Sequence, residues 1–191
     1  MGRGDMRRRF EEIYVAHYAD LLAYVRRRTT SPEDAADALA ETFATAWRRI
    51  GDVPAGPAAR LWLYGVARRV LANGRRAETR RSALVERLGA ELALWDARRR
   101  EEPPWPPDHG ELDAVRRAFR RLGADDREVL ALASWEGLAS AEIATVLGCS
   151  RGAARLRLHR ARKRLAAELS SAGVDMARYG VRMAVLAGGE A

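Results

Sequence analysis

Four prolines stand between positions 103 and 107, in the stretch "RREEPPWPPDHGE". Proline lacks the backbone N–H that a helix needs and clashes with the turn before it, so no helix can run through this stretch. On both sides of it apolar residues recur at helical spacing, and no alternating strand pattern is present. The sequence predicts an all-α protein with two small helical domains, residues 9–80 and 110–170, joined by a flexible, proline-containing linker over 81–109.

The formal net charge of +8 suits a polyanionic partner, either a nucleic acid or an anionic lipid surface. Lys163 is the only lysine among the 34 basic residues, which indicates a compositional bias toward arginine, so local arrangement is more informative than the total. One cysteine excludes an internal disulfide and a multi-cysteine zinc site, and no apolar run approaches the roughly 20 residues of a membrane span. We expect a cytoplasmic protein without membrane insertion.

The segment "SPEDAADALAETFATAWRRI" predicts a helix that begins after Ser31 as N-cap, with Pro32 in its first position. Two sets of residues recur along it at helical spacing. The apolar set predicts the buried side and comprises Leu39, Phe43, Ala46 and Ile50. The acidic set lies on another face and comprises Asp34, Asp37 and Glu41. That face is either a solvated surface or a docking strip for a basic partner.

The next segment, "ARLWLYGVARRVLANGRRAETRR", carries seven arginines against one glutamate over residues 60–81. Its predicted buried side comprises Leu63, Val66, Ala67 and Val70, so the arginines project elsewhere. Trp62 and Tyr64 stand beside them. Each aromatic is either a core residue or a stacking platform, because aromatics among arginines suit single-stranded nucleic acid.

The second domain ends in a pattern typical of a helix-turn-helix. Two amphipathic helices come first, one with Leu112, Val115, Phe119 and Leu122 that stops at Gly123, and one that closes at Gly137. The segment "SAEIATVLG" then predicts a short helix with Ser140 as N-cap, a buried side of Ile143, Ala144 and Leu147, and Gly148 as terminator. Cys149 falls in the turn, where we expect a small, half-buried apolar role, and Ser150 caps the last helix.

The last helix, "RGAARLRLHRARKRL", is strongly basic. Ala154, Leu158, Ala161 and Leu165 are expected to pack on the short helix, which leaves Arg151, Arg155, His159 and Arg162 outside. A membrane-surface helix needs a broad face of bulky apolar residues, whereas alanines fill half of this stripe. A merely solvated helix stays an alternative. The capped helix and turn before it favour duplex DNA, with Arg151 and Arg155 near the end that enters the groove.

Three stretches in order resemble bacterial RNA polymerase sigma factors of the extracytoplasmic-function group. They are "DAADALAETFATAW", "WLYGVARRVLANGRR" and "AEIATVLGCSRGAARLRLHRARKRL", and the resemblance extends from residue 9 to residue 168. It implies a promoter-specificity subunit and no enzyme, with no catalytic residues, no metal and no cofactor. Its implied partners are core RNA polymerase (the clamp helices of the largest subunit and the flap), duplex and single-stranded promoter DNA, and an anti-sigma protein.

The resemblance also implies roles for individual residues. The first domain docks on polymerase through Asp34, Asp37, Leu39 and Glu41. It melts the minus-ten element and holds a flipped base in a pocket formed by loop 52–59 and the arginine helix, with Trp62, Arg68, Arg69, Asn73, Arg75 and Arg76 as contacts. The second domain reads the minus-thirty-five duplex through Ser150, Arg151, Gly152, Ala153, Arg155, His159 and Arg162.

The chain departs from the family pattern at Ala40, Arg69, Gly123 and Leu156, where glutamine, asparagine, proline and a small polar residue are common. Residues 171–191 lie beyond the resemblance. Met176, Tyr179, Met183 and Leu186 recur there at helical spacing, so this tail is either frayed or a docking helix.

Two other function classes fit the charge. A stand-alone repressor or activator would use the helix-turn-helix alone and bind duplex DNA tightly without polymerase. A nuclease would need converging carboxylates around a metal, and the acids and the three histidines, at 17, 109 and 159, form no convincing set.

Overall fold

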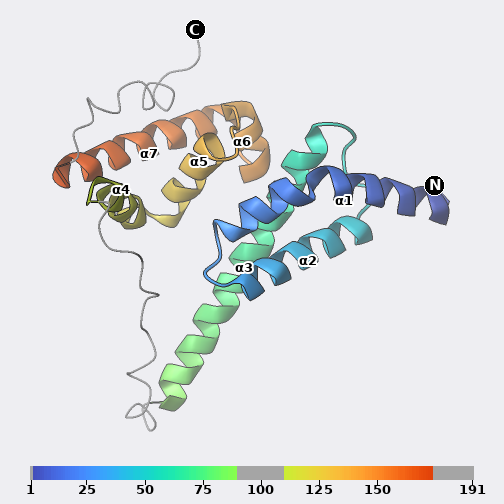
Figure 1. Ribbon diagram of the computed structural model, residues 1–191, viewed down its shortest axis with the longest axis horizontal. Helices are drawn as coiled ribbons and strands as arrows, with labels where there is room; N and C mark the ends of the chain where they lie inside the picture. Colours follow the sequence, from blue (N-terminus) through green and yellow to red (C-terminus); the bar gives the residue numbers. More distant parts are fainter. Residues whose placement is uncertain (1, 90–109, 174–191) are drawn as a thin grey trace. The chain divides into compact units, whose positions relative to one another are not determined.

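The computed structural model describes residues 2–89 and 110–173, with side chains described over 2–76 and 114–173. The chain divides into two compact units, Met1–Trp105 (unit 1) and Pro106–Ala191 (unit 2), and the division falls inside the segment expected to be the linker. Every regular element in the described residues is an α-helix, so the all-α prediction is confirmed (Figure 1).

Unit 1 contains α1 (Arg3–Arg26), α2 (Pro32–Arg48) and α3 (Ala58–Gly89), and each of these helices contacts the other two. Figure 1 shows α3 extending well past its two neighbours. This helix continues beyond residue 80, where we expected the linker to begin, because "RSALVERL" contains strong helix formers and neither proline nor glycine before Gly89. The helical part of the first domain is therefore longer than predicted.

The start of α2 follows the sequence prediction. The Ser31 hydroxyl oxygen accepts a hydrogen bond from the Asp34 backbone N–H at 3.0 Å, and Pro32 occupies the first helical turn. The predicted apolar side is buried at every position, and comprises Leu39, Phe43, Ala46 and Ile50. This face packs against the rest of unit 1.

Two stacked tyrosines lie in the core of unit 1. Tyr24 of α1 is fully buried, and its ring lies 4.8 Å from that of Tyr64 with 22° between the ring planes. Tyr64 is therefore a core residue, which settles the choice between core and stacking platform. In α3, Leu63, Val66 and Ala67 are buried as predicted, whereas Val70 is half-buried and Leu71 takes the buried position.

His17 gives unit 1 an expected dependence of stability on pH. Burial lowers the pKa of His17, Asp20 opposes this shift, and Arg60 adds to it. The His17 side chain takes up a proton at about pH 6.5 in the unfolded chain, but only at a lower pH in the folded protein. The free energy of unfolding therefore falls as the pH drops from about 6.5 toward the lowered pKa. We expect His17→Gln to lose less stability than the parent between about pH 7.5 and about pH 5.5 in urea unfolding. Equal losses in both proteins would refute this assignment.

Unit 2 contains α4 (Gly110–Arg121), α5 (Ala124–Ser134), α6 (Ser140–Leu147) and α7 (Arg151–Ser171), and α7 contacts the other three helices (Figure 1). Two exposed ion pairs link α7 to its neighbours: Arg164 with Asp126 of α5 at 2.5 Å, and Arg121 of α4 with Glu168 at 3.5 Å. In α4 the buried residues are Ala114 and Ala118, with Leu122 just after its end. The larger Val115 and Phe119 are half-buried, and the side chain of Leu112 lies outside the described residues.

The turn between α6 and α7 holds these helices in the helix-turn-helix arrangement. Gly148 adopts a left-handed conformation with φ of +64°, as a helix terminator requires, and the Cys149 N–H donates to the Ala144 carbonyl at 3.0 Å. The Ser150 hydroxyl oxygen accepts from the Ala153 N–H at 3.2 Å and caps α7. Cys149 is half-buried and free, as expected.

The start of α6 differs from the prediction. Ala139, and not Ser140, occupies the N-cap position, because the Glu142 carboxylate reaches back and accepts the Ala139 N–H at 2.8 Å. Ser140 is the first helical residue. Ile143 and Ala144 are buried as predicted. Val146 is buried as well, whereas Leu147 is only half-buried.

The hydrogen bond that caps α7 makes a measurable contribution to the stability of unit 2. We expect Ser150→Ala to lower the free energy of unfolding of unit 2 by about 1 kcal/mol, because the Ala153 N–H loses its acceptor. Thermal or urea unfolding followed through unit 2 measures this loss. Ser170→Ala, an exposed change near the other end of α7, is the control and should leave stability within about 0.5 kcal/mol. Equal effects of the two changes would contradict the capping role.

Candidate nucleic-acid interface

The exposed face of α7 is basic near the helix start. Arg151, Gly152, Arg155 and His159 are exposed, whereas Ala153 is half-buried. Leu156, one of the departures from the family pattern, is 48% exposed beside Arg155. Ser150 is exposed too, although its hydroxyl serves as the helix cap. We call Arg151, Gly152, Arg155, Leu156 and His159 the α7 face.

Arg162 does not belong to the α7 face, contrary to our expectation. It lies three residues after His159 and is turned toward α4 and α5, where it is half-buried. Its Nε atom is buried without a hydrogen-bond partner, and burial lowers the pKa of the guanidinium. Arg162 lines a cavity of about 150 Å³, which we call the α4–α5–α7 groove; the other lining residues are Phe119, Leu130, Ala131, Ser134, Trp135 and Leu165.

Leu165 also packs differently from the prediction. The residues of the α7 stripe that are buried as expected are Ala154, Leu158 and Ala161. Leu165 instead lies against the small cluster of Ala114, Ala118 and Leu169, which belongs to α4 and the end of α7. One helix face thus serves two neighbours, because α7 is long enough to pass from α6 to α4.

The acidic residues of α2 form an exposed strip in unit 1. Asp34, Asp37 and Glu41 are all exposed. Arg48 donates to the Glu41 carboxylate at 2.6 Å, and this hydrogen bond is the main reason that the pKa of Glu41 lies below its usual range. Glu41 therefore stays ionised under ordinary conditions, and the three exposed carboxyl side chains form the acidic surface that a basic partner would meet.

Leu39 does not lie on this strip. It is only 7% exposed and forms part of the core between the helices of unit 1. Its side chain is covered by the neighbouring helices, whereas Asp34 and Asp37 are exposed. We therefore leave Leu39 out of the docking residues that we predicted.

The basic residues of α3 are on the surface as predicted, apart from partial burial at the start. Arg69, Asn73, Arg75 and Arg76 are exposed, and Arg68 is half-buried. An Arg76 guanidinium N–H donates to the Asn73 side-chain oxygen at 3.3 Å. Trp62 is half-buried, with the Arg49 guanidinium 5.9 Å from its ring centre, and Arg49 in turn donates to Asp52 at 2.8 Å.

A cleft between α2 and α3 brings two of the predicted sites together. Its volume is about 270 Å³, and it is lined by Glu41, Thr45, Arg49, Val66, Arg69, Val70 and Asn73. Glu41 was predicted to meet polymerase, and Arg69 and Asn73 to meet DNA. Thr45 and Arg49 were missed by sequence reasoning. The signal that could have found them is their spacing of one and two helical turns from Glu41 on the same helix.

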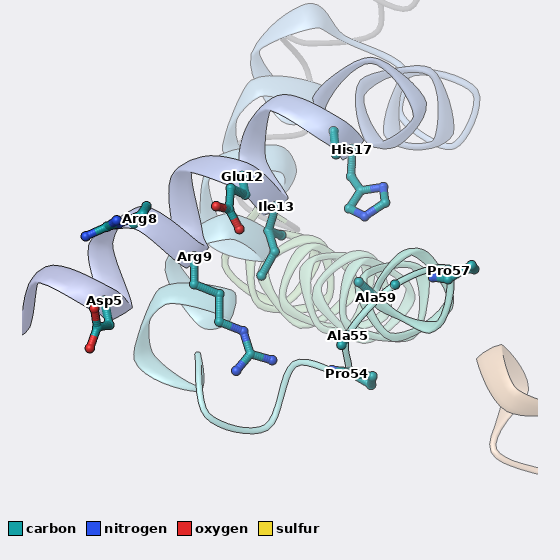
Figure 2. Close-up of a pocket in the computed structure, with 12 residues that line it drawn as sticks. Asp5, Arg8, Arg9, Glu12, Ile13, His17, Pro54, Ala55, Pro57 and Ala59 are labelled. Carbon is teal, nitrogen blue, oxygen red and sulfur yellow. The ribbon is translucent and has the colours of Figure 1, made fainter. Parts of the chain in front are cut away.

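The loop after α2 lines a cavity with the first half of α1 and with Ala59 at the start of α3. A cavity of about 650 Å³ lies between residues 54–59 and the first half of α1, whose contribution includes Arg8, Arg9, Glu12 and His17 (Figure 2). The Arg9 guanidinium donates to the Val53 carbonyl and ties the loop to α1. None of the six predicted minus-ten residues lines this cavity. The resemblance and the arginines drew attention to α3, whereas this cavity depends on how α1 packs.

Metal sites and membrane spans are both absent from residues 2–89 and 110–173. Within these residues, no group of three or more histidine, cysteine, aspartate or glutamate side chains is placed to hold a metal ion. No helix in the same residues has the length and hydropathy of a membrane span.

Residues 13–81 match the model for sigma-70 region 2, and residues 112–165 match the model for sigma-70, region 4. The chain is 32% identical over 168 residues to the ECF RNA polymerase sigma factor SigL of Mycobacterium tuberculosis, covering 85% of this chain and 89% of SigL. It is 30% identical over 169 residues to the RNA polymerase sigma-H factor of Pseudomonas aeruginosa, covering 84% and 86%.

Two solved structures share the fold. The sigma factor RpoE of Bartonella quintana, crystallised with the anti-sigma factor NepR, matches with a TM-score of 0.56 at 24% identity, covering 84% of this chain and 96% of that one. CnrH, in complex with the cytosolic domain of CnrY, matches with a TM-score of 0.56 at 23% identity, covering 86% and 90%.

Proposed function

Because this chain belongs to the extracytoplasmic-function group of RNA polymerase sigma factors, we propose that it grips promoter DNA at two points while bound to core polymerase. Promoter-specific initiation of transcription together with RNA polymerase follows from family membership. The assignment of separate contacts to the two units is our proposal. Unit 1 docks on polymerase and captures the minus-ten strand, and unit 2 reads the minus-thirty-five duplex.

The observation that carries this proposal is the arrangement of charge in unit 1. The acidic strip of α2 and the arginines of α3 are exposed on different helices, yet Glu41 meets Arg69 and Asn73 at one cleft. An acidic strip suits a basic protein surface, and arginines suit phosphates. Docking on polymerase and holding of DNA are thus assigned to adjacent faces of one small unit.

For strand capture we propose the exposed α3 residues Arg69, Asn73, Arg75 and Arg76, with Trp62 and Arg68 at the half-buried edge. A flipped base costs a few kcal/mol in lost stacking and pairing, which pocket contacts must offset. The cavity between loop 54–59 and α1 has room for such a base and lies next to the start of α3. Arg8 and Arg9 at its wall add positive charge for the adjoining phosphates.

For duplex reading we propose the α7 face. The capped turn fixes its start, and arginine pairs with guanine edges in the major groove. Leu156 adds an apolar contact suited to a thymine methyl group. We also assign the contact with the flap of polymerase to unit 2.

We further propose that the chain has an anti-sigma partner and acts in the cytoplasm, without catalytic activity of its own. RpoE, which shares its fold, was crystallised with the anti-sigma factor NepR, and the structure of CnrH, which also shares it, contains the cytosolic domain of CnrY. Pull-down from the native cell, followed by mass spectrometry, should recover core polymerase and one such inhibitor.

Selection from random duplex DNA tests the proposed division of labour. Polymerase loaded with this chain should enrich two separated sequence elements, whereas the chain alone should enrich none, because a single small helix face binds weakly. Tight enrichment of one element by the chain alone would favour the stand-alone repressor or activator. Metal-dependent cleavage of the DNA pool would favour a nuclease.

A further inference from the structure

The loop between α2 and α3, residues 49–57, forms one wall of the cavity in Figure 2 and contains Pro54 and Pro57. The two prolines have no N–H to donate, so backbone hydrogen bonds fix little of this stretch. Val53 is buried, and among the side chains that the structure describes only Arg9 hydrogen-bonds to residues 53–57, at the Val53 carbonyl. The position of the loop therefore depends on a contact with α1.

Arg9 is held in place by the residues near it on α1. The Phe10 ring centre lies 5.2 Å from that of Trp47 and 6.2 Å from that of Phe43, both on α2. Ile13, one turn after Arg9, is buried and lines the cavity. These contacts fix α1 against the last turns of α2. The half-buried Arg9 side chain thus extends from a fixed backbone toward the loop (Figure 2).

The hydrogen bond between Arg9 and Val53 determines how far the loop lies from α1. A guanidinium that donates to a carbonyl oxygen forms a charge-assisted hydrogen bond, and partial burial strengthens it relative to a contact in water. Pro54 and Ala55, directly after Val53, line the cavity together with Arg9. Loss of this bond would free the segment that forms the wall, so the shape of the cavity depends on Arg9.

We propose that Arg9 is a positioning residue for capture of the minus-ten strand. This role rests on the proposed function, in which the cavity takes up the flipped base. Arg9 holds residues 53–57 at a fixed distance from α1, so the cavity is formed before DNA arrives. A preformed site binds more tightly than one that must be ordered, because ordering a loop on binding costs conformational entropy. Arg8 lines the same cavity without a hydrogen bond to the loop in the described residues, so it supplies charge alone.

NMR relaxation of the Ala55 and Gly56 backbone amides in the free full-length chain tests whether Arg9 fixes the loop. We expect order parameters near the rigid value of about 0.85 in the parent and below about 0.6 in Arg9→Gln, because glutamine is too short to reach Val53. Arg9→Lys keeps the charge and a donor on a long side chain, so it should restore most of the order. Arg8→Gln removes the same charge from the same cavity and should match the parent.

Promoter opening by the chain bound to core polymerase tests whether the position of the loop matters for strand capture. Permanganate reactivity of unpaired thymines gives the rate of opening, separately from the affinity of the chain for polymerase. We expect Arg9→Gln to slow opening roughly tenfold with unchanged polymerase affinity, and Arg9→Lys to stay within about threefold of the parent. Arg7→Gln is the matched control and should open at the parental rate, because Arg7 is exposed, pairs with Glu11 and does not line the cavity.

Three results obtained with an active parent would overturn the proposal. Unchanged order parameters in Arg9→Gln mean that Arg9 does not fix the loop. A looser loop with a parental rate of opening means that the position of the loop does not matter for strand capture. Equal slowing by Arg8→Gln, with its loop ordered, means that charge and not loop position limits opening.

Failure of the proposed function gives a different result. If even the parent opens no promoter with core polymerase, strand capture by unit 1 is refuted, and the role of Arg9 in it is refuted as well. The order parameters come from the free chain without DNA or polymerase, so they still show whether Arg9 fixes the loop.

Discussion

Arg155→Ala is expected to weaken promoter binding by the polymerase complex by about 1 to 3 kcal/mol, or about 5- to 150-fold. Arg155 is exposed one turn inside α7, on the face that the capped turn presents. Loss of an arginine that pairs with a guanine edge removes discrimination at that base pair, in addition to affinity. Filter binding or fluorescence anisotropy, with the selected promoter and with variants at each position of its upstream element, measures both effects.

Arg157→Ala is the matched control for Arg155→Ala. Arg157 is an exposed arginine on the same helix, but it lies about 200° around the axis from Arg155. Arg157→Ala should lower the affinity for promoter DNA slightly and equally for all sequences, since any contact that Arg157 makes is with phosphate. Equal loss of specificity in both variants would contradict assignment of the α7 face to base reading.

The double change Asp34→Lys and Asp37→Lys is expected to weaken binding to core polymerase by about 3 kcal/mol, or roughly 150-fold. Both carboxylates are exposed on the acidic strip, so the reversed charges repel a basic docking surface. The expected loss decreases as salt rises, because screening weakens the repulsion. Competition against a labelled parent chain on core polymerase, at two salt concentrations, measures the affinity.

Glu11→Lys with Asp20→Lys provides the control with the same change in net charge. Both residues are exposed on α1, where they form surface ion pairs with Arg7 and Arg60 that contribute little stability. Polymerase affinity should stay within about threefold of the parent, because the strip on α2 is intact. Circular dichroism confirms that all variants remain folded. An equal loss from both double variants would indicate a general charge effect and no docking strip.

Helix positions and most buried residues were predictable because they depend on local periodicity. The cap at Ser31, the buried side of α2, the turn at Gly148 and the cap at Ser150 follow from sequence alone and are confirmed. In each case residues a few positions apart determine the structure. Ser140 is the exception, because Glu142 satisfies the Ala139 N–H and moves the helix start by one residue.

The wrong predictions depend on packing between distant segments. Helical periodicity places Arg162 near Arg151 and Arg155, yet α4 and α5 cover that part of α7. The pocket beside loop 54–59 requires α1, which is some 40 residues away in the sequence. Leu39 was assigned both to the core and to docking, and its burial supports only the core. Contacts of this kind are not encoded in any short window of sequence.

Transcription by purified core polymerase, with and without this chain, on fragmented genomic DNA of the source organism tests the central claim most directly. Sequencing of the RNA 5′ ends should show a small set of discrete starts that depend on the chain and share two upstream elements. A set of starts identical to that of core polymerase alone, with no association between the chain and polymerase in gel filtration, would contradict the account.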